Sequence, residues 1–444
     1  MRAERDSLGE LYLPDDALYG IATARAVDNF DLSRRPVNLC LIRAIIKVKK
    51  AAALTHQKLG AGAPGVYGAI AEACDIALAS GMDESGRMFV TDALQGGAGT
   101  STNMNVNEVL ANIALRVMGK QPGEYGFIHP LDDVNRGQST NDVYPTALRI
   151  AAIELLRLLS ERCASLQKAL QLRENEFDDI PKLGRTELMD AVPVTLGGEF
   201  GAWAQAAARD RWRLYKAEER LRQVNIGGTA VGVPDRMTRK YRFGVIEELR
   251  LITGIGLAAA EYPMDITQNN DVFVETSGLL KALAVNLMKT ANDLRLMNSG
   301  PHGGFGEISL PELQAGSTIM PGKVNPVIPE MVMQAAMKVM AGDVAISAAA
   351  SHGEFELNAF LPLIADTLLE NISLLERAVT LFEEKCVNIL SANRERCLQL
   401  LESSCAFAAS YVPLLGYDRV AEIVRNAGSV SKIKEYLERA AKNR

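Results

Sequence analysis

The chain has 444 residues, of which 48% are hydrophobic and 23% charged, and its formal net charge is −6. This length allows two or three domains with a large apolar core, and the mild negative charge gives no reason to expect nucleic acid or an acidic membrane surface as a partner. Residues 1–6 are charged and lack the apolar stretch of a signal peptide. No run reaches the roughly 18 apolar residues that cross a bilayer. We therefore expect a cytoplasmic protein that binds neither nucleic acid nor a membrane.

The six cysteines show neither a Cys-x-x-Cys spacing nor a nearby histidine pattern. Those spacings are the usual sequence signals of zinc sites and redox motifs. We expect reduced thiols with a structural role, and no metal site.

Long amphipathic segments follow a mixed N-terminal part. A turn is predicted at residues 15–20 and a helix over residues 43–59. From Tyr144, leucine and alanine recur at helical spacing between charged residues, which predicts a helix of about thirty residues. The same pattern predicts three further long helices, over about 196–224, 271–297 and 326–390, with polar residues at 351–354 marking a bend in the last.

Helices of this length are typical of side-by-side bundles. We predict a mainly α fold with three domains: a mainly helical N-terminal domain (1–138), a central bundle of long helices (139–390) and a small helical C-terminal domain (391–444). Methionines gather near the start of the last stripe, between Met331 and Met340. They could pack inside one subunit or against other subunits, and the sequence leaves both alternatives open.

The stretch from Gly316 to Pro326 is predicted to be a mobile loop that enters a helix. Gly316 and Gly322 allow backbone angles that other residues resist. Asn325 and Pro326 have the residue types of an N-cap and a first helical position. The loop also holds two hydroxyls, a cation and an amide, which suit the binding of a carboxylate and the transfer of a proton beside it; they belong to Ser317, Thr318, Lys323 and Asn325.

Residues 95–105 form a second block with chemistry for an anion. Three glycines within four positions let backbone N–H groups approach a negatively charged ligand. Thr100 and Ser101 follow directly and add hydroxyl donors. A glycine-rich turn alone is a weak signal, and a structural turn is the alternative.

Residues 129–142 form a third block that ends where the helix from Tyr144 is predicted to begin. Ser139, Thr140 and Asn141 are therefore expected at a helix N-terminus, where free N–H groups and the helix dipole favour a bound carboxylate. N-capping explains one or two of these residues but not the whole run.

These blocks, together with residues 184–193, resemble the signatures of the aspartase/fumarase superfamily, whose members form fumarate from a substituted succinate by breaking a C–N or C–O bond. The resemblance extends over almost the whole chain. It implies a three-domain, mainly α subunit whose central bundle joins three others in a homotetramer. It also implies active sites shared by three subunits, a small dicarboxylate amino-acid substrate and no required cofactor.

The resemblance also implies roles for individual residues. Ser317 matches the base that takes a proton from the carbon beside a carboxylate, and Lys323 is carried over with it as catalytic. The remaining residues are carried over as substrate-binding, with Thr318 and Met320 contributing from the closing loop; they are Thr100, Ser101, Ser139, Thr140, Asn141, Thr186, Thr318, Met320 and Asn325.

Glu187 departs from the family pattern, because relatives usually have histidine at this position, paired with the glutamate that matches Glu330. Two carboxylates would repel each other unless one binds a proton or a cation. A substrate ammonium group would be attracted to Glu187, whereas a hydroxyl leaving group would gain nothing. We therefore include Glu187 among the substrate-binding residues. The alternative is that it points away into a structural salt bridge.

We expect a carbon–nitrogen lyase that eliminates ammonia from L-aspartate or a close amino-succinate. Three alternatives stay open on the sequence. The first is a lyase for an N-substituted or cationic aspartate analogue, for which Glu187 would set specificity. The others are a class II-type fumarate hydratase and a non-catalytic paralogue.

Overall fold

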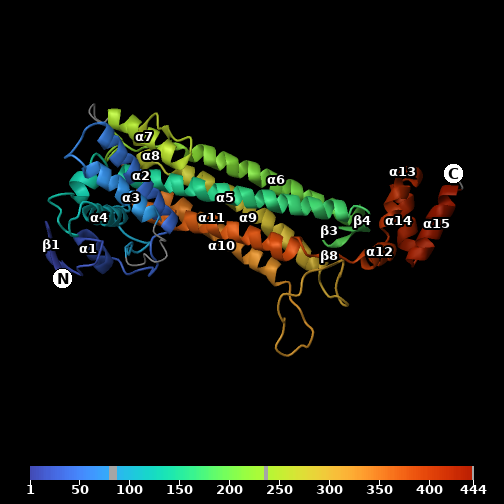
Figure 1. The fold of residues 1–444 in the computed structure, drawn as a ribbon. Coiled ribbons are helices and arrows are strands. Elements are labelled where there is room, and N and C mark those ends of the chain that lie inside the picture. The colour runs from blue at the N-terminus through green and yellow to red at the C-terminus, as the bar shows by residue number, and fades with distance from the viewer. Residues whose placement is uncertain (80–87, 235–238, 443–444) are drawn as a thin grey trace. The chain divides into compact units, whose positions relative to one another are not determined.

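The computed structural model describes residues 1–79, 88–234 and 239–442, and most of these residues are helical (Figure 1). The α-helices are α1 Ile21–Asn29, α2 Leu39–Lys58, α3 Val66–Ala79, α4 Thr100–Val117, α5 Thr140–Glu176, α6 Leu196–Leu221, α7 Arg239–Thr253, α8 Pro263–Gln268, α9 Asp271–Met297, α10 Val327–Ala350, α11 Leu361–Phe382, α12 Arg394–Glu402, α13 Val412–Leu415, α14 Tyr417–Asn426 and α15 Val430–Lys442. Three short helices of other types are η2 Pro130–Val134, η3 Glu383–Val387 and η4 Ala406–Tyr411. The mainly α fold is confirmed.

The strands pair two by two. They are β1 Arg2–Asp6 with β2 Gly9–Leu13, β3 Pro181–Thr186 with β4 Met189–Thr195, β5 Gln223–Val224 with β6 Ala258–Ala259, and β7 Ile308–Ser309 with β8 Ser391–Ala392. The pair β5–β6 is parallel and the other three pairs are antiparallel. The hairpin β3–β4 matters for the site, because it carries the predicted residues Thr186 and Glu187 at its turn.

The chain divides into two compact units, which are described separately. Unit 1 contains residues 1–160, 213–281 and 338–374, and unit 2 contains residues 161–212, 282–337 and 375–444. Each unit holds segments of the long helices α5, α6, α9, α10 and α11. The predicted domain boundaries at 138 and 390 stay predictions.

Within each unit, polar contacts tie neighbouring long helices together. In unit 1, Asp343 of α10 accepts hydrogen bonds from Ser277 and Lys281 of α9 at 2.8 and 2.5 Å. In unit 2, both carboxylate oxygens of Asp210 on α6 accept from Asn286 of α9 at 3.0 and 2.8 Å. Between such contacts the packing is apolar, because many leucine and alanine side chains of α5, α9 and α11 are buried, among them Leu148, Leu280 and Leu368. The predicted bundle of long helices is thus observed as packed helix segments in both units.

The predicted long helices match the structure in position. The helix predicted over 271–297 has the bounds of α9, and α5 and α6 contain most of the helices predicted from 144 and from 196. The stripe over 326–390 is instead two helices, α10 and α11, separated by residues 351–360. Asn358 ends the first of them, because its Nδ2 donates to the carbonyls of Ala349 and Ala350. The predicted bend at 351–354 is therefore a complete break.

Residues after 390 form a small helical cluster of their own within unit 2. Helices α13, α14 and α15 and the short helix η4 bury one apolar core, made of Ala408, Leu415, Val420, Ala427, Ile433 and Leu437. All six cysteines of the chain are described and free, as predicted.

Helix α10 is apolar along much of its length. By length and composition alone it could cross a membrane, as could the bent pair 394–402 and 406–415 taken together, and 33% of the α10 window is buried in the chain. The core helix of a soluble protein passes the same test. Met337 and Val344 of α10 are 53% and 69% exposed, so this helix presents an apolar surface that the single chain leaves uncovered.

Candidate functional site

In unit 1, the structure brings the glycine-rich block and the Ser139–Asn141 block together. Thr100 and Ser101 form the first turn of α4, and Thr140 and Asn141 form the first turn of α5. Asn103 of α4 joins the two helix ends, because its Nδ2 donates to the Thr140 Oγ1 at 3.2 Å. Two segments predicted separately to bind anions therefore lie side by side.

A capping box closes the start of α5. The Ser139 hydroxyl oxygen accepts from the Asn141 N–H at 3.2 Å, and the Asp142 Oδ1 accepts from the Ser139 N–H at 3.0 Å. The other Asp142 oxygen accepts from the N–H groups of Gly227 and Thr229, both at 3.0 Å. Because Asp142 is buried, its pKa rises to about 7, although the backbone donors and Lys49 oppose this rise. Asp142 thus anchors the Ser139–Asn141 block to the 225–230 segment.

Proline within α5 frees a carbonyl for a second anchor. Pro145 has no N–H, so it cannot bond the Asn141 carbonyl four residues earlier. Asn225 takes that place, with its Nδ2 donating to the Asn141 oxygen at 3.0 Å. The Asn141 side-chain nitrogen donates in turn to the Ala230 carbonyl at 2.8 Å. The main-chain carbonyl and the side-chain amide of Asn141 are therefore both held by hydrogen bonds.

The glycine-rich turn before α4 requires left-handed backbone at three successive residues, Gly97, Ala98 and Gly99 (φ +83°, +56° and +91°). A Cβ added to Gly99 would lie 2.3 Å from the Tyr144 ring. This close approach explains the glycine and packs the turn directly against α5. The Thr100 hydroxyl donates to the Gly97 carbonyl at 2.8 Å, which closes the turn.

In unit 2, Thr186 and Glu187 lie at the tip of the β3–β4 hairpin and are exposed. Thr186 pairs with Met189, so Glu187 and Leu188 form a two-residue turn, and both have left-handed backbone (φ +54° and +64°). Such turns normally use asparagine and glycine, because other residues are strained there. Strained, exposed turns of this kind are common at functional sites.

The base of the same hairpin is held by buried charges. Lys182 lies 2.9 Å from Glu199 and 3.1 Å from Glu307, and Arg185 lies 2.9 Å from Glu307. The Arg185 guanidinium also stacks on Phe305, at 4.3 Å from the ring centre. The hairpin is therefore rigidly anchored at its base, although its tip is exposed.

The loop from Gly316 to Asn325 is closed on itself. Its ends meet because the Gly316 N–H donates to the Lys323 carbonyl and the Asn325 Nδ2 donates to the Gly316 carbonyl, both at 2.8 Å. The Ser317 Oγ accepts from the N–H groups of Ile319 and Met320 at 3.2 and 2.8 Å. Two backbone dipoles thus point at the hydroxyl predicted to act as the base.

Asn325 does not have the predicted capping role. Helix α10 begins at Val327, so Pro326 precedes its first residue, and the Asn325 amide holds the loop rather than the helix end. Thr318, Met320 and Lys323 lie in the same loop and are exposed. Among the described residues, no hydrogen bond or ion pair joins this loop to the hairpin tip.

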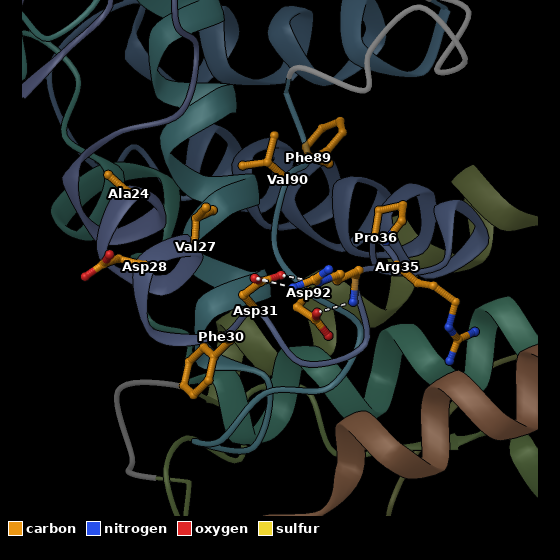
Figure 2. Close-up of a pocket in the computed structure, with 11 residues that line it drawn as sticks. Ala24, Val27, Asp28, Phe30, Asp31, Arg35, Pro36, Phe89, Val90 and Asp92 are labelled. Atoms are coloured by element: carbon orange, nitrogen blue, oxygen red, sulfur yellow. Dashed lines mark hydrogen bonds and ion pairs between the residues drawn. The ribbon is translucent and has the colours of Figure 1, made fainter.

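Two cavities lie near charged side chains. One of about 720 Å³ in unit 1 lies between the end of α1, residues 30–36 and residues 89–92 (Figure 2). Asp92 at its edge already accepts from Ser33 and Arg34, and none of the predicted site residues lines it. The other, of about 350 Å³ in unit 2, has Glu187 in its wall. In the described part of the chain, no group of three or more His, Cys, Asp or Glu side chains is arranged to hold a metal ion.

The sequence analysis did not identify the buried residues that hold the Ser139–Asn141 block in place through hydrogen bonds. Lys49 of α2 is fully buried beside this block, and its Nζ donates to Asn135 and Gln138 at 2.8 and 3.0 Å. A signal existed, because Lys49 falls at an apolar phase of a helix whose neighbouring positions are Ile45, Ile46 and Ala52. Asp142 follows Ser139 by three residues, which is the spacing of a capping box and was a second available signal, whereas the 225–230 segment carried none.

Known proteins resemble this chain over almost its whole length. Residues 9–341 match a family model described as lyase. An aspartate ammonia-lyase from Pseudomonas fluorescens is 45% identical over 429 residues, which are 96% of this chain and 89% of that protein. The solved structure of a fumarate lyase, delta crystallin, from Brucella melitensis bound to cobalt has a TM-score of 0.93 and 44% identity, and covers 99% of this chain and 98% of its own. A class II fumarase from Schistosoma mansoni has a TM-score of 0.91 and 32% identity, with 100% and 95% covered. The chain belongs to the aspartase/fumarase superfamily of lyases.

Proposed function

We propose that this protein is an aspartate ammonia-lyase, which converts L-aspartate to fumarate and ammonia. The observation that carries the proposal is the 45% identity, over 96% of the chain, to a protein named for this activity. Every residue that the family resemblance assigns to the substrate is present, apart from the histidine replaced by Glu187.

Ser317 is the base of the proposed reaction. A serine hydroxyl is a poor base until its alkoxide is stabilised, and the Ile319 and Met320 N–H groups that donate to Ser317 Oγ would stabilise that negative charge. The alkoxide takes the proton from the carbon beside one carboxylate, and the electron pair moves into that carboxylate to form an aci-carboxylate. Its collapse forms the C=C bond, breaks the C–N bond and releases ammonia.

The carboxylate sites have different supports. At one end, the α5 N-terminus offers Ser139, Thr140 and Asn141, with the helix dipole favouring an anion. The Asn141 Nδ2 donates to the Ala230 carbonyl, which fixes the side-chain amide. Its Oδ1 would then accept a hydrogen bond from the substrate ammonium group. At the other end, Lys323 and Asn325 would hold the second carboxylate beside Thr186, and Thr100, Ser101, Thr318 and Met320 would line the closed site.

We propose further that four chains assemble and that each site takes residues from three of them. The support is the exposure of the unit 2 residues: Ile319 is 83% exposed and Met320 49%, although the mechanism needs a site without water. The uncovered apolar face of α10 gives a surface for such assembly. The same proposal includes a soluble, cytoplasmic enzyme without a required cofactor.

The test is the absorbance of fumarate during incubation of the purified protein with L-aspartate, L-malate and a panel of N-substituted aspartates. Fumarate and ammonia in equal amounts from aspartate support the proposal. Formation of fumarate from malate alone would reassign the protein as a fumarate hydratase.

One observation favours a second candidate, a lyase for an aspartate analogue that carries a further positive charge. The Glu187 carboxylate is exposed at a strained turn beside Thr186, where a cationic substituent on the substrate nitrogen would pair with it. The variants Glu187→His and Glu187→Gln test this. If the preference for a cationic analogue over aspartate is the same in both variants and the wild type, Glu187 does not set specificity.

A further inference from the structure

Lys49 lies in the interior of unit 1 without a counter-charge in contact. Its side chain is fully buried, and its ammonium group donates to two neutral amide oxygens, Asn135 Oδ1 at 2.8 Å and Gln138 Oε1 at 3.0 Å. The structure records no ion pair for Lys49 among the described residues. The nearby Asp142 carboxylate has its oxygens occupied by three backbone N–H groups. Neighbouring lysines differ, because Lys50 pairs with Asp75 at 2.5 Å.

A buried cation held by neutral groups is costly for folding. Removing an ammonium group from water costs free energy that a carboxylate partner normally offsets. Burial accordingly lowers the pKa of Lys49 to about 7. The Ser139–Asn141 block, which is proposed to bind a carboxylate, lies beside this buried cation, so a bound anion would offset part of that cost.

Hydrogen bonds connect Lys49 to the substrate-binding Thr140. Asn135 Oδ1 accepts from Lys49 and also from Asn103 Nδ2 at 3.1 Å. The same Asn103 nitrogen donates its other hydrogen to Thr140 Oγ1 at 3.2 Å. Because Thr140 Oγ1 accepts this bond, its own hydrogen is directed elsewhere. Asn135 itself is fixed, since its Nδ2 donates to the Gln138 carbonyl at 3.1 Å.

We propose that Lys49 is a positioning residue for the substrate carboxylate bound at the N-terminus of α5. Through Asn135 and Asn103, it holds the Thr140 hydroxyl so that the hydroxyl donates to that carboxylate. The bound carboxylate is in turn a second counter-charge for Lys49, in addition to Asp142, which is near the ammonium group but not in contact with it. This inference rests on the function proposed above, because the carboxylate is that of the dicarboxylate substrate.

The first experiment compares Lys49→Met with Lys50→Met, which removes a neighbouring charge outside this network. Methionine has a similar length and no charge. In Lys49→Met, KM for L-aspartate should rise about tenfold or more, because the Thr140 hydroxyl is no longer held in the orientation that donates to the substrate carboxylate. The midpoint of thermal unfolding should stay the same or rise, because the buried charge is gone. Lys50→Met should leave both quantities unchanged.

Two further variants separate positioning from simple packing. Lys49→Arg keeps the charge, so its KM for L-aspartate should lie between those of the wild type and Lys49→Met. If Lys49 acts through Thr140, the double variant Lys49→Met, Thr140→Val should have a KM close to that of Thr140→Val alone. Three outcomes would overturn the proposal. They are additive increases in KM from Lys49→Met and Thr140→Val, a KM of Lys49→Met within twofold of wild type, and a higher KM of Lys49→Met that comes with a large drop in its unfolding midpoint.

A binding measurement keeps this test separate from the test of the proposed function. Calorimetric titration with succinate reports on the carboxylate site without turnover. Tight binding to wild type and Lys50→Met, with about tenfold weaker binding to Lys49→Met, supports the role of Lys49 even if aspartate is not converted. Equal succinate binding by all three proteins overturns that role, whereas absence of fumarate formation by the wild type overturns only the proposed reaction.

Discussion

The N-terminus of α5 and the hairpin tip with the Ser317 loop are built in opposite ways. At the α5 end, Thr140 is buried, and Asn141 and Asp142 are bonded to residues more than eighty positions further along the chain. At the other, Glu187 and Lys323 are exposed, and the loop's hydrogen bonds are internal. The proposed carboxylate site at α5 is thus prepared by the fold of a single chain. The proposed base, Ser317, lies instead on a segment that, under the same proposal, neighbouring chains or closure of the loop would complete.

This difference suggests a division of labour. Residues that bind an anion gain from being held rigidly before the substrate arrives, because no ordering cost remains to be met on binding. A base that must act without water gains from lying on a loop that closes over the site only after the substrate has bound. Four predictions test the contrast, from the largest expected effect to the smallest.

Ser317→Ala should lower kcat for fumarate formation by about 10³-fold, because the group that takes the proton is lost. The midpoint of thermal unfolding should not change, since the loop makes few contacts with the rest of the unit. Ser403→Ala is the control and should keep full activity, because Ser403 is an exposed serine outside the proposed site whose hydroxyl only donates to a local carbonyl. Retention of activity in Ser317→Ala would refute the assignment of the base.

Asp142→Ala should lower the free energy of unfolding by about 3 kcal/mol, because three backbone N–H groups, one of them fully buried, lose their acceptor. Thermal unfolding of the purified variant measures this. Asp75→Ala removes an exposed ion pair with Lys50 and should have little effect. Equal losses in the two variants would mean that the α5 end is no more strongly anchored than the surface.

The pH dependence of stability should reveal Lys49. Its pKa is about 7 in the folded chain, against 10.5 for an ordinary lysine. Between these values the unfolded chain binds more protons, so the free energy of unfolding rises with pH, by at most about 1.4 kcal/mol per pH unit. In Lys49→Met this rise above pH 7 should disappear. Asp142, whose pKa burial raises from 3.8 to about 7, acts in the window below pH 7, where it makes the free energy of unfolding fall as the pH rises. Besides Asp142, the charged form of the Cys74 thiol would also raise the pKa of Lys49. Lys50→Met is the control, and identical slopes in both variants would contradict the prediction.

Leu188→Gly should raise the free energy of unfolding by about 0.5 kcal/mol, because glycine relieves the left-handed strain but has more freedom when unfolded. Leu188 is 63% exposed, so little burial is lost. Leu188→Val, which resists this backbone conformation more strongly, should lower the midpoint of thermal unfolding. A midpoint that falls in Leu188→Gly would show that the side chain is held by contacts rather than strained.

Much of the helical architecture could be predicted, because apolar periodicity survives in long helices. The bounds of α9 follow directly from its stripe. The break between α10 and α11 depends on Asn358 folding back onto the carbonyls of Ala349 and Ala350, which periodicity does not record. Pro362, at the second position of α11, was an available sign of a new helix start.

The hairpin β3–β4 was hidden for a different reason. Its turn residues, Glu187 and Leu188, are not those that two-residue turns prefer, so the sequence lacked the usual hairpin signal. Candidate site residues could be named where they form runs, as with Ser139 to Asn141, and their roles stay predictions. Lys49 and Asp142 also support this run through bonds to Asn135, Gln138, Gly227 and Thr229, and the spacing of the sequence does not identify those partners.

The proline in α5 has a consequence for the order in which this protein is made. Because Pro145 leaves the Asn141 carbonyl to Asn225, and Asp142 depends on Gly227 and Thr229, the first turn of α5 lacks its partners while the ribosome is still adding the residues between them. The α5 helix can form early, but the contacts of its first turn are completed only after about another ninety residues have emerged. A nascent chain stopped before residue 225 would therefore carry the whole Ser139 block and still lack an ordered anion site.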